Sequence, residues 1–126
     1  MGKLFLSTVL LALTTSGCAV LGLGAGVVIS QDMMDSNTFV AQLNEDVDVA
    51  WATTKASMGR QSDQPIHIFD DVRSTTANID GAEVTASIEV YDLDSCRLII
   101  SARKYGVPNG DIAELVFGRV LQNFSE

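Results

Sequence analysis

The sequence has few of the residues that most catalytic and metal sites need. Its 126 residues include one histidine, His67, and two cysteines, Cys18 and Cys96. Asp70 and Asp71 follow His67 closely, but no third ligand for a metal ion is evident beside them. The Gly-x-Ser-x-Gly sequence of a hydrolase nucleophile is absent. We therefore expect no catalytic residues, no metal site and no cofactor.

Positive charge is also scarce. Lysine and arginine together number 8 against 16 acidic residues, so the formal net charge is −8. Nucleic-acid binding depends on the neutralisation of phosphates by lysine and arginine, and no basic patch is present. We expect no nucleic-acid partner, and we expect contact with an anionic membrane surface only through an anchor.

The N-terminal 18 residues have the pattern of a secretory signal peptide. Lys3 supplies a positive start, residues 4–13 are apolar, and the small residues Ser16 and Gly17 precede Cys18. The apolar stretch is much shorter than the roughly 20 residues that a membrane-spanning helix needs. A cysteine in place of an ordinary cleavage site resembles a bacterial lipoprotein signal. The resemblance implies cleavage before Cys18, a diacylglycerol on its thiol and acylation of the new amino end.

Two interpretations of this region stay open. In the alternative to lipidation the signal is not cleaved, and the uncharged stretch between Leu4 and Gln31 is long enough to span a membrane as a helix. We favour lipidation, because three glycines at positions 22, 24 and 26 weaken a helix. Lipidation divides the chain into a signal peptide, residues 1–17; a lipidated cysteine with a Gly-rich apolar tether, residues 18–35; and a folded α+β domain, residues 36–126.

Ala19 bears on the location of the anchor. In Gram-negative lipoproteins an aspartate at this position retains the protein in the inner membrane. The resemblance therefore implies an outer-membrane anchor with the domain facing the periplasm. Stable anchoring needs at least two acyl chains such as palmitate, which a triacylated Cys18 supplies. Cys96 is then the only remaining thiol, and we expect it to be a small buried apolar residue.

Apolar residues at helical spacing predict a first helix after Asp35, Ser36 and Asn37, any of which can cap it. Gly59 is a suitable end for this helix. The residues of its predicted apolar face are Phe39, Val40, Leu43, Val47, Ala50, Trp51 and Met58.

From Pro65 onward the apolar residues alternate with polar ones, which predicts strands. Asp80-Gly81 is a strong hairpin signal. The predicted strands lie near residues 66–72, 75–79, 82–91 and 97–103. If the last two form a hairpin, Glu83 and Glu89 lie near Arg97 and Arg103.

A closing helix is expected from Asp111, which serves as a capping acid, and its apolar face extends to Phe124. The order of elements predicts an α+β fold: an antiparallel meander of about four strands, with an N-terminal and a C-terminal helix packed on one face.

With these elements the chain resembles a family of small, uncharacterised Gram-negative lipoproteins that carry a domain of unknown function. The matching segments are Gly17-Cys18-Ala19, the tail Leu21–Gly26, the Asp80-Gly81 hairpin, and Tyr105-Gly106 through Gly110-Asp111. The resemblance implies a lipid anchor and a helix–meander–helix domain. It implies no activity.

We therefore expect a non-enzymatic envelope lipoprotein with a structural or partner-binding role, anchored by Cys18. The predicted partner surface is an unpaired strand edge or the polar sheet face, which carries Thr85, Ser87, Tyr91 and Ile99. One alternative is a tethered module that binds a small ligand in a cavity lined by Trp51, Phe69 and Phe117. Another is an enzyme that uses His67.

Overall fold

The computed structural model describes residues 27–92 and 94–124. That part of the chain contains two helices and seven strands in an α+β arrangement. Their bounds are β1 Val28–Asp35, β2 Thr38–Leu43, α2 Val47–Gln61, β3 His67–Phe69, β4 Ser74–Ile79, β5 Ala82–Asp92, β6 Ser95–Lys104, β7 Val107–Pro108 and α3 Gly110–Phe124.

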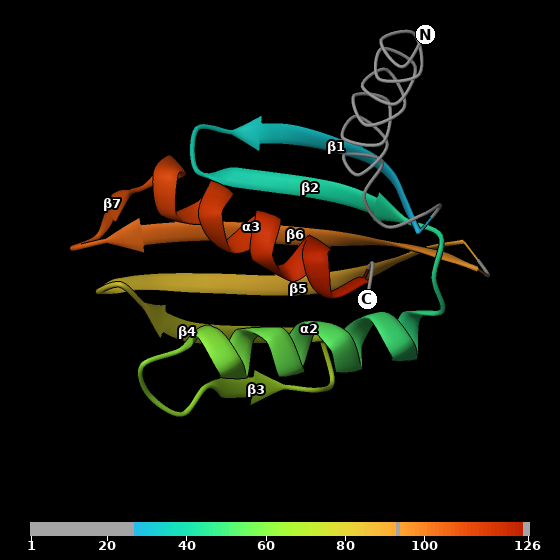
Figure 1. Ribbon diagram of the computed structural model, residues 1–126, viewed down its shortest axis with the longest axis horizontal. Helices are drawn as coiled ribbons and strands as arrows, with labels where there is room; N and C mark the ends of the chain where they lie inside the picture. The colour runs from blue at the N-terminus through green and yellow to red at the C-terminus, as the bar shows by residue number, and fades with distance from the viewer. Residues whose placement is uncertain (1–26, 93, 125–126) are drawn as a thin grey trace, which may run out of the picture.

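The described strands form one antiparallel sheet in the order β1-β2-β6-β5-β4-β3, and β7 pairs with the end of β6. Figure 1 shows both helices in front of this sheet. Helix α2 contacts β4 and β5, whereas α3 contacts β6 and β2. The predicted α+β class is confirmed, but the sheet has seven strands rather than about four.

The β4–β5–β6 meander follows the sequence prediction closely. Asp80 and Gly81 both have positive φ, 53° and 78°, and they join Ile79 directly to its partner Ala82. Two successive residues with positive φ make the tight turn whose twist matches that of the paired strands. Alternate residues of β5 and β6 then point to the helices and form the centre of the core.

The predicted N-terminal helix is wrong before residue 47. Residues 28–43 form a β-hairpin, so the tether assigned to residues 18–35 overlaps strand β1, and the folded part already includes Val28. The spacing of the apolar residues in the stretch 38–43 fits both a helix and a strand, so local spacing could not decide between the two. The decisive factor is β6, which pairs with β2 along its whole length from Thr38–Ser101 to Leu43–Cys96.

Helix α2 begins at Val47 because Asp46 caps it. The Asp46 carboxylate accepts hydrogen bonds from the backbone N–H groups of Asp48 and Val49, at 3.0 and 3.3 Å. The predicted caps at residues 35–37 instead lie at the β1–β2 turn. There Asn37 is buried, and its side-chain amide donates to the Ala102 carbonyl at 2.9 Å. This bond ties the hairpin to β6.

Helix α3 begins one residue earlier than predicted, and its cap is a different residue. The Asn109 side chain accepts a hydrogen bond from the Ile112 N–H at 3.1 Å, so Asn109 takes the capping role predicted for Asp111. Asparagine and aspartate cap equally well. The position of the residue in the turn after β7, and not its type, therefore decides whether Asn109 or Asp111 caps the helix.

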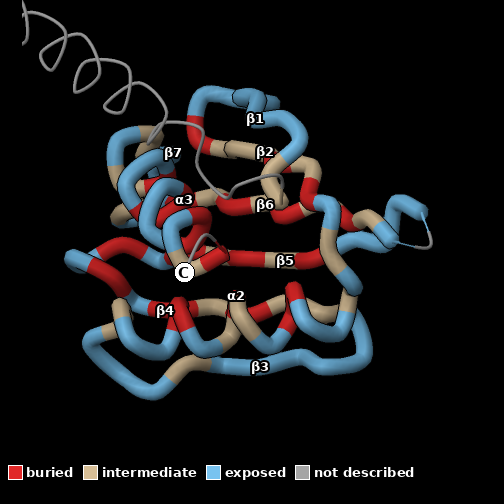
Figure 2. Tube along the Cα trace, turned by 45° about the vertical axis from the view of Figure 1, so that its right-hand side comes forward, coloured by how far each residue is buried: buried red, intermediate tan, exposed pale blue. Residues whose placement is uncertain are grey.

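The hydrophobic core lies between the two helices and the central strands. Figure 2 shows β5, the middle of β6 and the inner sides of both helices buried, while β1 and β3 are largely exposed. Trp51 and Met58 of α2 are buried as predicted, together with Val116, Phe117 and further residues of α3. Both edges of the sheet thus extend beyond the helices that cover its centre.

The two glycines of α3 have opposite surroundings, which gives a test of the hairpin–helix contact. A Cβ at Gly110 would collide with the Ser36 carbonyl oxygen in the β1–β2 turn, whereas a Cβ at Gly118 would meet open space. We expect Gly110→Ala to destabilise the fold by about 1–3 kcal/mol through overpacking. Gly118→Ala should stabilise it by about 1 kcal/mol through helix propensity.

Urea unfolding followed by the fluorescence of Trp51, the single tryptophan, measures both changes. Equal stabilities of the two variants would contradict the packing of the α3 start against the hairpin turn.

Candidate functional site

The sheet face opposite the helices carries the predicted partner surface. Ser87 lies directly opposite Ile99, and Thr85 lies opposite Ser101. Tyr91 is on the same face, because the Arg97 guanidinium lies over its ring at 5.4 Å. The four predicted residues therefore share one face. Whether that face binds a partner stays a prediction.

The charged residues of this face pair across strands as expected. Glu83 lies opposite Arg103 and Glu89 opposite Arg97 in the β5–β6 register. Arg97 Nη2 lies 3.4 Å from Glu89 Oε1, with about half of each side chain exposed. Exposed pairs of this kind contribute at most about 1 kcal/mol, so they help the register more than they indicate a binding site.

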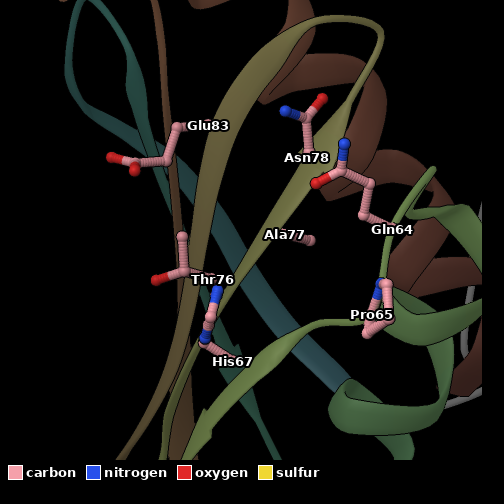
Figure 3. A pocket seen from close by; sticks show the side chains of 7 residues that line it. All are labelled: Gln64, Pro65, His67, Thr76, Ala77, Asn78 and Glu83. Carbon is pink, nitrogen blue, oxygen red and sulfur yellow. The ribbon is translucent and has the colours of Figure 1, made fainter.

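His67 lies on the β3 edge, opposite Thr76 of β4. Figure 3 shows it at one end of a small pocket, with Gln64 and Asn78 at the other end and Glu83 directed away. Among the described residues, no group of three or more histidine, cysteine or acidic side chains is placed to hold a metal ion. The backbone carbonyl of His67 accepts a hydrogen bond from Thr75 Oγ1 at 2.7 Å.

The three aromatic residues considered for a ligand cavity lie in different places. Phe117 stacks at a tilt on Phe39, with ring centroids 5.5 Å apart. Trp51 is buried under α2 and donates a hydrogen bond from Nε1 to Asp70. Phe69 is exposed and lies opposite Ser74, on the face of the sheet away from the helices. They do not line one common cavity.

Strand β1 supplies the unpaired edge that was the other predicted partner surface. Among the described strands it pairs with β2 alone, and it is exposed from Ile29 to Asp35. Ile29, Met33 and Met34 are 54%, 58% and 62% exposed. A long edge strand with exposed apolar side chains is a template for pairing with another chain. Sequence reasoning missed its position, because β1 was assigned to the tether.

Beside β1 lies a groove of ≈ 280 Å³ between the strand and helix α3. It exists because α3 covers β6 and β2 but stops short of the sheet edge. Its lining combines apolar and acidic side chains: Gln31, Asp32, Met33, Phe39, Glu114, Phe117 and Gly118. The groove and the edge together offer backbone hydrogen bonds and an apolar slot, the two components of strand addition.

Comparison with protein-family models and with curated proteins gives no match to this chain. The resemblance to small lipoproteins therefore stays a prediction. Within residues 27–92 and 94–124, neither helix is long and apolar enough to cross a membrane. Cys18 and the predicted signal peptide lie outside the described residues.

Asp70 is the centre of a cluster of polar contacts that the sequence did not predict. Its Oδ1 accepts hydrogen bonds from Trp51 Nε1 at 2.9 Å and from Lys55 Nζ at 3.2 Å. The Lys55 ammonium also lies 5.1 Å from the centre of the Trp51 ring. The partners are 15 and 19 residues away in sequence, so no local pattern indicated them. The cluster fastens the β3–β4 loop to α2.

The Asp70 cluster predicts a pH dependence. The Trp51 hydrogen bond, followed by that of Lys55, holds the pKa of the Asp70 carboxyl below its usual 3.8. A lowered folded-state pKa means that the stabilisation is complete above the unfolded value and is lost as the pH falls through the folded value. We expect an acid-induced change in Trp51 fluorescence below pH 3.8 that Asp70→Asn abolishes.

The neighbouring variant Asp71→Asn is the matched control, and it should keep the wild-type acid transition. A transition that Asp70→Asn leaves unchanged would mean that Trp51 reports on other carboxyl groups.

Cys96 is buried, as the sequence predicted, and its thiol lies 3.7 Å from the Glu45 carbonyl. Burial, followed by the charges of Glu45 and Asp46, raises the pKa of this thiol from 9.0 to about 11. In the Cys18→Ala variant we expect no reaction with a disulfide reagent at about pH 8 in the native state, and one reacting thiol in urea. Rapid native labelling would contradict the burial of Cys96.

Proposed function

We propose that this protein is a non-enzymatic, membrane-anchored envelope lipoprotein that binds a partner through the β1 edge and the groove beside it. Cys18 is the proposed lipid attachment site in the outer membrane, facing the periplasm. The observation that carries the proposal is an exposed edge strand of eight residues beside an apolar groove. Proteins blunt unpartnered edges with bulges and charged residues. Strand β1 has register irregularities near both ends, but residues 30–33 between them keep a regular edge.

The distance from the anchor supports the same edge. Val28, the start of β1, follows Cys18 by ten residues. Ten fully extended residues reach at most about 35 Å, so the start of β1 stays within that distance of a lipid on Cys18. A partner that pairs with β1 must therefore lie in the membrane or close to it.

The anchor is tested by the intact mass of protein extracted from membranes. We expect a chain that begins at residue 18 with added acyl mass, and loss of this species in Cys18→Ala. An uncleaved chain without lipid would contradict the anchor and would favour the N-terminal helix as the membrane attachment.

The binding edge is tested by a photo-crosslinking residue placed at Met34 of β1 in cells. Phe69 of β3 is the matched control, because it lies on the opposite edge of the sheet with a similar exposure, 51% against 62%. We expect a defined crosslinked species from Met34 and none from Phe69. Equal crosslinking from both edges, or none from Met34, would contradict β1 as the binding edge.

A further inference from the structure

The chemistry of the β1 edge identifies the class of partner that fits it, and this inference rests on the function proposed above. The Met33 backbone N–H donates to the carboxylate of its neighbour Asp32 at 2.9 Å. This amide on the edge strand is thus satisfied by a side chain. An incoming strand can take over this bond and release the Asp32 carboxylate for a cation.

The two faces of β1 would contact different kinds of side chain on an added strand. Met33 lies opposite Phe39, on the face toward α3, whereas Asp32 lies opposite Val40, on the face away from the helices. Side chains of an added strand alternate between the same two faces. One set would enter the apolar slot formed by Met33, Phe39 and Phe117, and the other would lie beside Asp32 and Asp35.

Gly118 keeps the apolar slot open. It lies in the middle of α3, where glycine is unfavourable for the helix. A Cβ at this position would have no neighbouring atom within 4 Å, so close packing does not require a glycine here. It lines the groove on the side facing β1. The free volume above it is available to a side chain of a bound segment.

Charge favours a basic occupant. Asp32 borders both this groove and a hollow on the outer face of the sheet, and Glu114 lines the groove. Among the described residues, no lysine or arginine lines the groove. Arg119 lines a neighbouring hollow that shares Glu114 and Gly118 with the groove. Arg97 lines the outer-face hollow together with Asp32, and its guanidinium pairs with Glu89. A second copy of this chain would bring Asp32 and Asp35 of two β1 strands together, in molecules that each carry a net charge of −8.

We propose that the β1 edge binds an extended basic protein segment in which apolar residues alternate with lysine or arginine. The segment adds antiparallel or parallel to β1 as an eighth strand of the sheet. Its apolar residues enter the groove over Gly118, and its cationic residues lie beside Asp32.

The test uses the full chain in a non-ionic detergent and a blocked, fluorescent eight-residue peptide of alternating valine and lysine, with fluorescence anisotropy as the readout. A peptide of alternating valine and glutamate is the control for charge. Gly118→Phe fills the groove, and Gly59→Phe makes the same change on the exposed side of α2. Asp32→Asn removes the charge but keeps an acceptor for the Met33 amide.

We expect the valine–lysine peptide to bind, and Gly118→Phe and Asp32→Asn each to raise its dissociation constant about tenfold at low salt. Gly59→Phe should leave binding unchanged. Circular dichroism shows whether each variant is folded. If Gly118→Phe does not fold, Asp32→Asn still tests the surface.

Equal binding of the acidic peptide, unchanged binding by both Gly118→Phe and Asp32→Asn, or no binding of the basic peptide would overturn the inference. So would a dimer of the free chain that closes the β1 edge, detected by analytical ultracentrifugation. Crosslinking from Met34 without binding of the basic peptide would reject this partner class and leave the proposed function standing. Failure of both experiments would reject both.

Discussion

The pairing of β2 with β6 is the contact on which the rest of this structure depends. It joins residues 38–43 to residues 96–101 through an unbroken antiparallel register. Because β2 lies next to β6, the chain must cross the sheet to reach β3 at the far edge, and α2 makes that crossing. The same pairing provides the surface for α3 and leaves β1 as the outermost strand.

The unequal width of the two layers explains the candidate site. Two helices of fifteen residues cover the centre of a sheet that is six strands across, so the edges extend beyond them. At the β3 edge, the Asp70 cluster with Trp51 and Lys55 fastens the following loop to α2, and β3 itself has only three residues. At the β1 edge the strand is longer and neither described helix covers it. The asymmetry between a short fastened edge and a long open edge favours β1 as the place for a partner.

The polar face of the sheet provides a useful contrast with the edge. Its serine and threonine side chains lie in cross-strand rows with Ile99 and Val40, and Glu89 forms an ion pair with Arg97 across strands. At the β1 edge, the Met33 backbone N–H donates to the side chain of its neighbour Asp32. In the proposed complex, an incoming strand replaces Asp32 as the acceptor for this N–H.

The sequence by itself determined the α+β class, the β4–β5–β6 meander, the closing helix and the burial of Cys96. Each of these depends on local signals: strict alternation, two turn residues at Asp80-Gly81, or a continuous apolar helix face. Only the tertiary structure decided the state of residues 28–43, the cap of α2 at Asp46 and the Asp70 cluster. A short apolar stretch satisfies helix and strand periods equally, and the choice depends on whether a distant strand supplies its backbone hydrogen bonds. The β1 edge and its groove belong to this second group, because an edge is defined by the strand that is missing beside it.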